Sequence, residues 1–412
     1  MKTGYSKFFL LWIGNFISQI GGGLTSFGLG IYVFNMTGSA ASMAVVTLMG
    51  FLPALILSVP AGVLADMFDR RVLMMTGDGL SALGILYILI LMMAGHCTLL
   101  NICIGVFISS VFSSLLEPAY RSTITDILTK EEYTKASGLV SVAGSARYLV
   151  SPMIAGLLLA VYDIKLLLII DICTFFVTIT VTAVVRRGIV TVKTGRKERF
   201  LESFAEGRDS LYKRKGVFKL IMISSVITMF MGVVQVLSEP MMLSFTDSKT
   251  LGFAETLCAT GMLVMSVIIG IVGIKKRHSK VLGISLAMSG VFMIGFASKE
   301  NIVLICIFGA LFFAMLPMAN SSLDYLARIN IPEELQGRAW GFIGFLSQLG
   351  YIPAFALSGV LADGAAKAFD MTVGRGSALV ITVSGVMLVI TSLITLFSKK
   401  IEDLESGKEK PA

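Results

Sequence analysis

Long apolar runs, separated by short polar breaks, make up most of the 412-residue chain. The runs are roughly 20 residues long, which is the length that a helix needs to cross the hydrocarbon core of a bilayer. They do not alternate between apolar and polar positions, so the pattern favours helices over the strands of a membrane barrel. We therefore predict an all-α membrane protein with about twelve transmembrane helices. The predicted spans are 8–34, 43–65, 72–94, 100–124, 139–161, 166–185, 217–243, 251–274, 281–297, 301–327, 339–362 and 377–398.

The composition supports a membrane protein and excludes several kinds of site. Charged residues make up 15% of the chain, whereas a soluble domain carries about 25%. The five cysteines have no CxxC spacing, and His96 and His278 lie in loops predicted on opposite sides of the membrane. We therefore expect neither a metal site nor a cofactor. The first run lacks a small-residue cleavage signature, so we expect it to be retained as a helix.

Positive charge is concentrated on one side of the predicted membrane. With a cytoplasmic N-terminus, only five of the 34 Lys and Arg residues fall in outer loops: Lys165, Lys249, Lys299, Lys367 and Arg375. Because cytoplasmic loops carry an excess of Lys and Arg, we predict that both termini are cytoplasmic and that the protein lies in the cell (cytoplasmic) membrane. The basic residues do not form one surface, so we expect no nucleic-acid partner.

The longest polar stretch lies in the middle of the chain. It runs from Arg186 to Lys219 and contains eleven Lys/Arg and four Asp/Glu, with Phe200, Phe204 and Leu211 on one helical face. This pattern fits either a solvated linker or an interfacial helix on anionic lipid headgroups. The predicted domains are an N-terminal six-helix bundle at 1–185, a cytoplasmic basic linker at 186–219, a C-terminal six-helix bundle at 220–398 and a cytoplasmic tail at 399–412.

The two halves of the chain resemble each other. Residues 129–138 (TKEEYTKASG) align with 331–341 (IPEELQGRAWG), and 151–160 align with 352–362, with a proline in the matching place. Both pairs occur in the same order on the same membrane side, which favours a duplicated six-span unit. Parallel repeats of this kind are typical of transporters that rock two bundles about a central site. Seven of the nine prolines fall in predicted spans, which indicates jointed helices: Pro53, Pro60, Pro118, Pro152, Pro240, Pro317 and Pro353.

A cluster of charges interrupts the apolar sequence. Residues 8–65 contain no charged side chain, and then Asp66, Asp69, Arg70 and Arg71 follow within six positions. A carboxylate at the membrane surface is costly unless it is paired. Arg70 is four residues after Asp66, within reach on a helix, and its planar fork can bind a carboxylate through two nitrogens. A positively charged loop that sets topology is the alternative explanation.

The segment GVLADMFDRR resembles the signature of the major facilitator superfamily, through Gly62, Asp66, Arg70 and Arg71. The twelve spans, the central basic loop and the repeat are similar to that family as well. Within it, the chain looks closest to the macrolide-efflux and siderophore-exporter branch of proton-coupled drug exporters. The segments that carry this resemblance are LADMFDRR, EPAYRSTITDILTKEEYTKASG, IIDICTFF and IPEELQGRAWG. Met67 departs from the pattern, because many members have a basic residue there.

The resemblance implies a gating motif on the cytoplasmic face. Its expected members are Gly62, Asp66, Asp69, Arg70 and Arg71. Asp126 lies near the same membrane surface, and we expect it to complete the motif through a charge network with Arg70. It implies that Asp66 contacts the start of the eleventh span, between Gly337 and Trp340, and so joins the two halves while the outer side is open. The sequence itself supports the attraction, because the N-terminal end of a helix carries partial positive charge.

Polar residues inside apolar spans are rare and are candidates for function by default. The proton-coupling candidates are the carboxylates Asp171, Glu239 and Glu117. Glu117 precedes Arg121 by four residues, so a purely structural ion pair is an equal alternative there. The candidates for lining a cargo cavity are Asn15, Gln19, Arg121, Gln235, Asn320 and Asp324.

These observations predict a proton-coupled exporter of amphiphilic small molecules such as macrolide-like drugs, acting by alternating access. No GxxxxGK[ST] motif is present, so drive by ATP is not indicated. No nucleophile–base arrangement indicates an enzyme. Export of an endogenous siderophore or lipid is the main alternative, and a non-transporting receptor is a third. The expected partners are a small-molecule substrate, protons and membrane lipids, and we expect a monomer.

Overall fold

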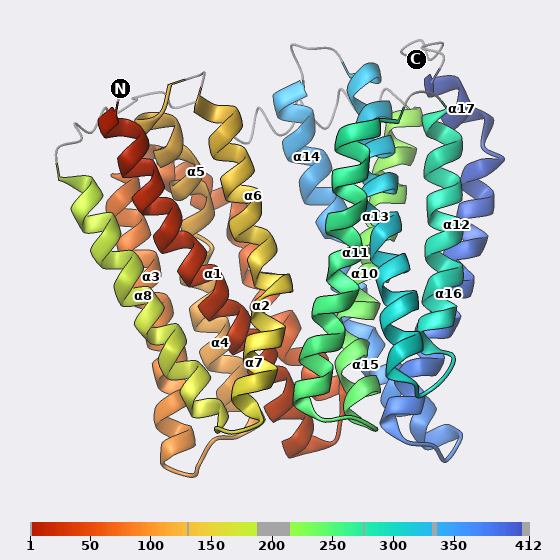
Figure 1. Ribbon diagram of the computed structural model, residues 1–412, viewed down its shortest axis with the longest axis horizontal. Coiled ribbons are helices and arrows are strands. Elements are labelled where there is room, and N and C mark those ends of the chain that lie inside the picture. The colour runs from red at the N-terminus through yellow and green to blue at the C-terminus, as the bar shows by residue number, and fades with distance from the viewer. Residues whose placement is uncertain (1, 130–131, 188–214, 275–276, 332–335, 406–412) are drawn as a thin grey trace. The chain divides into compact units, whose positions relative to one another are not determined.

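The computed structural model describes residues 2–129, 132–187, 215–274, 277–331 and 336–405. These ranges are almost entirely helical and contain no strand (Figure 1). Within them, twelve helical segments are long and apolar enough to cross a membrane. The predicted fold class, an all-α membrane protein with twelve spans, is therefore confirmed. The predicted interfacial helix of the basic linker lies outside the described residues.

Helices begin and end close to the predicted spans. The helices before the basic linker are α1 (Lys2–Thr37), α2 (Ala40–Met67), α3 (Arg70–Met93), α4 (Leu99–Ser113), α5 (Leu116–Ile127), α6 (Tyr133–Leu149), α7 (Ser151–Leu159) and α8 (Ile164–Arg186). Those after it are α10 (Lys215–Leu243), α11 (Ser248–Val272), α12 (His278–Ala297), α13 (Ile302–Asn330), α14 (Gln336–Gln348), α15 (Tyr351–Ala368), α16 (Val373–Leu396) and α17 (Lys399–Glu405).

Three spans are each built from two consecutive helices, α4–α5, α6–α7 and α14–α15. In each case the second helix has a proline within its first three residues: Pro118, Pro152 and Pro353 respectively. Proline suits the first turn of a helix, where no partner for its missing N–H is needed, but it interrupts a continuing one. Pro152 and Pro353 were matched by the internal repeat, so the repeat places equivalent joints in the two halves.

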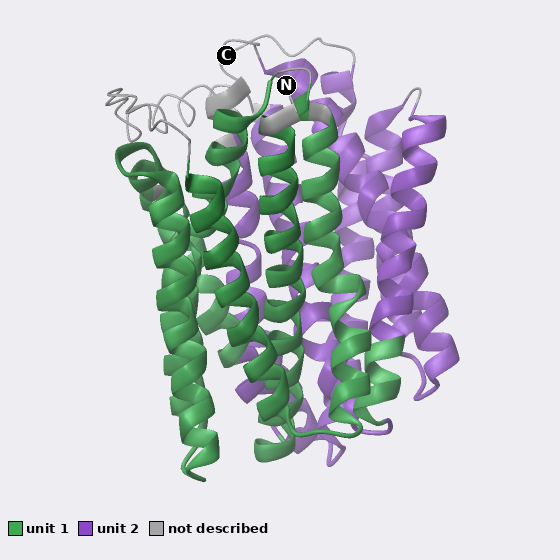
Figure 2. Ribbon diagram, turned by 60° about the vertical axis from the view of Figure 1, so that its left-hand side comes forward, with its two compact units in different colours: residues 1–38, 45–197, 247–253 green, residues 39–44, 198–246, 254–412 purple. Residues whose placement is uncertain are grey.

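The protein divides into two compact units (Figure 2). Unit 1 contains residues 1–38, 45–197 and 247–253, and unit 2 contains residues 39–44, 198–246 and 254–412. Two helices are divided between them. The first turn of α2 belongs to unit 2, and the first turn of α11 belongs to unit 1.

Contacts inside each unit hold these two divided helices. In unit 2, Asp363 of α15 accepts hydrogen bonds from Ser39 Oγ at 2.5 Å and from the amides of the next two residues at 3.0 and 3.1 Å. A carboxylate satisfies free amides at a helix start and interacts well with its positive end. In unit 1, Gly252 of α11 lies so close to the carbonyl of Pro152 in α7 that a β-carbon would clash.

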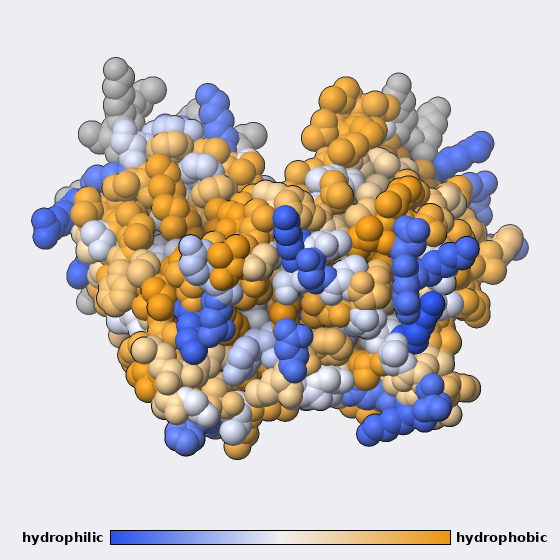
Figure 3. Space-filling view, turned by 60° about the horizontal axis from the view of Figure 1, so that its bottom comes forward, coloured by the Kyte–Doolittle hydropathy of each residue, from blue (hydrophilic) through white to orange (hydrophobic). Residues whose placement is uncertain are grey.

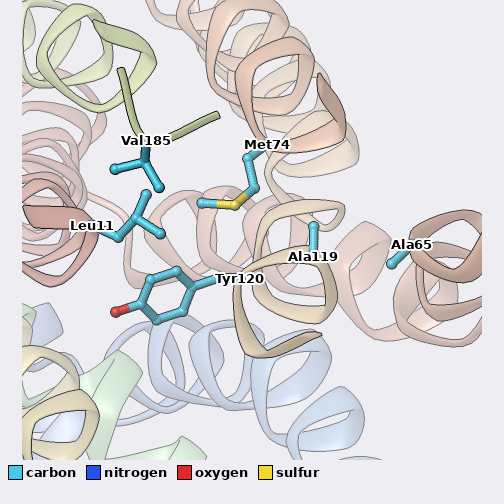
Figure 4. Packing of buried hydrophobic residues seen from close by; sticks show 6 residues of the cluster. All are labelled: Leu11, Ala65, Met74, Ala119, Tyr120 and Val185. Carbon is cyan, nitrogen blue, oxygen red and sulfur yellow. The ribbon is translucent and has the colours of Figure 1, made fainter. Parts of the chain in front are cut away.

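Five helices of unit 1 meet in a buried apolar cluster (Figure 4). The cluster consists of Leu11, Ala65, Met74, Ala119, Tyr120 and Val185. The side chains of Leu11, Met74 and Val185 point toward a common space beside Tyr120. Ala65 lies at the end of α2 and Met74 at the start of α3. This packing therefore positions the charged turn that joins those two helices.

Apolar side chains also cover much of the face that Figure 3 shows, and hydrophilic ones occur there in separate groups. Leucine, isoleucine, valine and phenylalanine side chains remain exposed on most of the spans. So much apolar surface is unfavourable in water. It fits a multi-pass protein whose helices contact lipid.

The last described helix, α17, packs against α10, α12 and α13 within unit 2. Leu404 is fully buried, and its carbonyl accepts a hydrogen bond from Asn330 Nδ2 at 3.0 Å. Glu405 accepts hydrogen bonds from the amide of His278 at 2.8 Å and from Ser279 Oγ at 2.6 Å. Burial raises the pKa of Glu405, but these hydrogen bonds outweigh it and hold the pKa below its usual range. Nothing in the sequence pattern predicted this helix within the tail.

Candidate functional site

The charged turn between α2 and α3 is organised by Asp69. Its backbone is extended, and its carboxylate accepts a hydrogen bond from the amide of Arg71 at 3.1 Å. Aspartate is favoured in this N-cap position because it satisfies an amide that has no partner within the helix. The sequence Asp-Arg-Arg therefore ends one span and starts the next, with both arginines in the first turn of α3.

Asp126 on α5 forms ion pairs with both arginines of the turn. Arg70 Nη1 lies 2.6 Å from one carboxylate oxygen of Asp126, and Arg71 Nη2 lies 3.0 Å from the other. Only 2% of the Arg71 side chain is exposed, so Asp126 and the more distant Asp69 compensate a buried charge. Arg186 at the end of α8 donates to Asp69 at 3.0 Å. The expected network between Asp126 and Arg70 is present, and it extends to Arg71.

Asp66 is held much less firmly than Asp126. Its side chain is 64% exposed, and its ion pair within the described residues is to Arg70 Nη2 at 3.6 Å. Arg70 also donates to Asp126 and to the carbonyl of Ser122 at 3.0 Å. Asp66 therefore remains accessible to a further partner. A β-carbon at Gly62 would meet no atom within 4 Å, so the described contacts give no steric reason for that glycine.

Asp126→Asn is expected to lower the free energy of unfolding by about 1–3 kcal/mol. Asparagine keeps one acceptor oxygen but leaves the buried Arg71 guanidinium without its closest charge partner. Because 35% of the Asp126 side chain is exposed, solvent offsets part of the loss. Denaturant titration of the purified protein in detergent measures the change. An unfolding midpoint equal to that of the wild type would contradict the proposed compensation.

Glu117 and Arg121 form the ion pair that their spacing predicts. Arg121 Nη2 lies 2.7 Å from Glu117 Oε1 on α5, and both side chains are 68% exposed. The two opposite charges compensate each other on the surface of unit 1. Glu117 therefore has a cation beside it, unlike the more enclosed acids of the spans, and its role in proton coupling stays a prediction.

The cavity-lining candidates lie on neighbouring helices in each unit. In unit 1, Asn15 and Gln19 are partly buried one turn apart on α1, and Arg121 is exposed on the adjacent α5. In unit 2, the candidates are exposed on the adjacent helices α10 and α13; they are Gln235, Asn320 and Asp324. The structure therefore gathers each set locally, and a shared cavity stays a prediction.

Glu239 has a second carboxylate beside it. It lies on α10 and interacts electrostatically with Glu255 on α11. Ser238 Oγ lies 3.5 Å from Glu255 Oε1, at the long end of the hydrogen-bond range. Glu239 Oε2 is buried and has no hydrogen-bond partner among the described residues. The sequence identified Glu239 as a candidate, but the pairing with Glu255 depends on how two helices face each other.

Asp171 is the most enclosed of the predicted proton-coupling residues. It is buried on α8, and its carboxylate accepts a hydrogen bond from Thr25 Oγ1 of α1 at 2.6 Å. Asp78 of α3 is also buried and interacts electrostatically with Asp171. The sequence pattern placed Asp78 inside a span, but it gave no reason to join it to Asp171.

Comparison with known proteins shows which protein families this chain is similar to. The model of the Major Facilitator Superfamily matches residues 11–355. Macrolide efflux protein A of Streptococcus pyogenes is 23% identical over 362 residues, which cover 87% of this chain and 89% of that protein. The Staphyloferrin A transporter of Staphylococcus aureus is 23% identical over 307 residues, which cover 69% of this chain and 72% of that protein.

A solved structure confirms the fold. The POT family transporter PepTSo superposes with a TM-score of 0.76 over 97% of this chain and 98% of that one, at 10% sequence identity. At that identity the likeness concerns the arrangement of helices, not the cargo.

Proposed function

The chain belongs to the Major Facilitator Superfamily, and from that premise we propose that it exports amphiphilic, macrolide-like small molecules across the cytoplasmic membrane in exchange for protons. It is a multi-pass membrane transporter and not an enzyme. The exchange requires the two units to open alternately to the two sides of the membrane. We propose that Asp66 is a latch on the cytoplasmic face, through the contact with the start of the eleventh span that the family resemblance implies.

The observation that carries proton coupling is the Glu239–Glu255 pair. Two neighbouring carboxylates repel each other, and in the described residues neither forms an ion pair with Lys or Arg. Burying a charged carboxylate costs far more than burying the neutral acid. Binding one proton removes the repulsion and gives Glu239 a hydrogen to donate. A site of this kind takes up and releases protons as its access to water changes.

The cargo class is supported by relatedness. The macrolide efflux protein and the siderophore transporter are similar to this chain at the same identity, but the alignment with the former is longer. This difference favours a macrolide-like cargo. Export of a siderophore is the second candidate.

A panel of cargoes in proteoliposomes tests the proposal. A macrolide, a polycarboxylate siderophore and a lysolipid would each be measured with and without an imposed pH gradient. We expect the macrolide alone to accumulate, and only with the gradient. Accumulation of the siderophore instead would mean that the cargo is a siderophore and not a macrolide. Equal uptake into protein-free vesicles would contradict transport by the protein.

Orientation is a separate prediction. Reporters fused within residues 186–219 are expected on the cytoplasmic side, and reporters within residues 94–99 on the outside. The reason is the excess of Lys and Arg in the former stretch. Accessibility of the two reporters to an impermeant reagent in intact cells measures this. The opposite pattern would reverse the inferred direction of the helices.

A further inference from the structure

An open cavity lies at the end of the α3–α8 pair that is next to the charged turn. It measures about 390 Å³ and is lined by Met75 of α3, by Ala183 and Arg186 of α8, and by Arg187, which follows α8. Helices α3 and α8 pack side by side within unit 1 (Figure 1). None of the four lining residues is a candidate for the cargo cavity or for proton coupling. The proposed transport mechanism therefore does not account for this cavity.

Two arginines of the lining leave positive charge at the cavity. Arg186 Nε donates to Asp69 Oδ2 at 3.0 Å, and the other oxygen of Asp69 accepts from the amide of Arg71 at 3.1 Å. Within the described residues, the Nη nitrogens of Arg186 form no hydrogen bond. The Arg187 side chain is exposed and forms no ion pair with any residue in the described part of the chain. The single carboxylate of Asp69 therefore compensates the two lining arginines only in part.

The helix contact next to the cavity is apolar. A β-carbon at Gly79 of α3 would lie 3.7 Å from Ile179 Cδ1 of α8. Gly79 is four residues after Met75, and Ile179 is four residues before Ala183. Residues four apart lie one above the other on the same face of a helix. The contact of Gly79 with Ile179 therefore lies one turn deeper in the two spans than the cavity.

Exposed apolar side chains continue this surface toward the middle of the spans. Leu83 is four residues after Gly79 and is 53% exposed, and Phe176 is three residues before Ile179 and is 63% exposed. Such side chains are unfavourable in water and suit the acyl chains of a bilayer. We call these four residues the apolar strip. The cavity thus has arginines at its polar end and the apolar strip on the side toward the membrane centre.

The occupant that fits this arrangement is both anionic and amphiphilic. A guanidinium group keeps its charge at physiological pH and binds a phosphate through two nitrogens at once. Basic pockets between spans bind the headgroups of anionic lipids at the cytoplasmic surface of a membrane. A soluble phosphate would match the two arginines, but it would leave the apolar strip without a partner. An anionic phospholipid matches both.

We propose that this cavity binds the headgroup of one anionic phospholipid, with its phosphate at Arg186 and Arg187 and an acyl chain along the apolar strip. The binding is non-covalent, and guanidinium N–H groups donate to the phosphate oxygens. The inference goes beyond the proposed export, because neither a cargo nor a proton takes part in it. The lipid site and the proposed export can therefore fail separately.

Lipid titration of the purified protein, followed by native mass spectrometry, measures this binding without cargo and without a pH gradient. The probes are phosphatidylglycerol and phosphatidylcholine with identical acyl chains. We expect the wild type to bind one phosphatidylglycerol about tenfold more tightly than phosphatidylcholine. Equal affinities would overturn the proposal. Complete displacement of phosphatidylglycerol by inorganic phosphate would identify a site for free anions and would also overturn it.

The substitution Arg187→Gln tests the charge at the cavity. It removes the lining arginine that forms no ion pair in the described part of the chain, and it should weaken phosphatidylglycerol binding about fivefold. Lys135→Gln is the matched control, because Lys135 is exposed on α6 at the same predicted membrane side and does not line the cavity. The control should bind phosphatidylglycerol as the wild type does. An equal loss in both variants would mean that overall charge attracts the lipid, which would contradict the site.

The substitution Ala183→Leu tests the cavity itself. The larger side chain fills space beside the arginines and leaves the charge unchanged. We expect the affinity for phosphatidylglycerol to fall to that for phosphatidylcholine. Wild-type affinity for phosphatidylglycerol in folded Ala183→Leu would contradict a headgroup bound in the cavity. If Ala183→Leu does not fold, Arg187→Gln at its exposed position still decides between the two outcomes.

Discussion

Replacement of Glu239 by glutamine is expected to abolish transport driven by a pH gradient while leaving cargo binding and gradient-free exchange largely intact. Glutamine has the size and hydrogen-bonding ability of the protonated acid but cannot release a proton. It would fix the site in its loaded form and also remove the repulsion from Glu255. Transport should therefore lose its dependence on the gradient. Protons taken up per cargo molecule in proteoliposomes measure the effect.

A structural role for Glu239 predicts a different result. If the side chain only holds α10 to α11, Glu239→Gln should reduce the amount of folded protein. Glu255→Gln is the matched variant, because it changes the same pair from the neighbouring helix. An unchanged ratio of protons to cargo in well-folded Glu239→Gln would exclude the carrier role and transfer it to Asp171 or Glu117.

Asp66→Asn is expected to reduce transport roughly tenfold, within the range of about 5- to 150-fold that a conformational coupling typically produces. The free energy of unfolding should change by less than about 0.5 kcal/mol. The carboxylate is exposed, and its ion pair with Arg70 is long. We propose that the Asp66 carboxylate instead acts as a latch that holds the start of α14 during one half of the transport cycle. Initial rates in proteoliposomes at matched protein content measure the loss.

The variant Asp126→Asn is the control for this experiment. It alters the same network but is expected to act on stability through Arg71. If Asp66→Asn transports at the wild-type rate, the latch is wrong, and the charged turn serves to set topology. If instead it unfolds as readily as Asp126→Asn, the carboxylate has a structural role.

The lengths of the apolar runs were sufficient to predict twelve spans, because a bilayer imposes both helical structure and a minimum length. Local spacing also predicted the pairs Asp66–Arg70 and Glu117–Arg121, since residues four apart meet on any helix. The repeat matched the prolines at which two spans break. These features depend on neighbours in the sequence or on the solvent alone.

Contacts between distant helices could not be predicted in the same way. The pairing of Glu239 with Glu255 and of Asp171 with Thr25 depends on the rotation of each helix about its axis. In spans that are apolar all round, no amphipathic stripe reveals that rotation. Asp363 shows the same limit, because its partners at the start of α2 lie more than 300 positions away in the chain.

Simultaneous measurement of cargo and proton movement in wild-type proteoliposomes tests the central claim most directly. With an imposed pH gradient, cargo should move in one direction and protons in the other at a fixed ratio. A cargo gradient alone should drive protons the opposite way. Cargo that equilibrates without moving protons, at the same rate whatever the pH gradient, would contradict proton-coupled export.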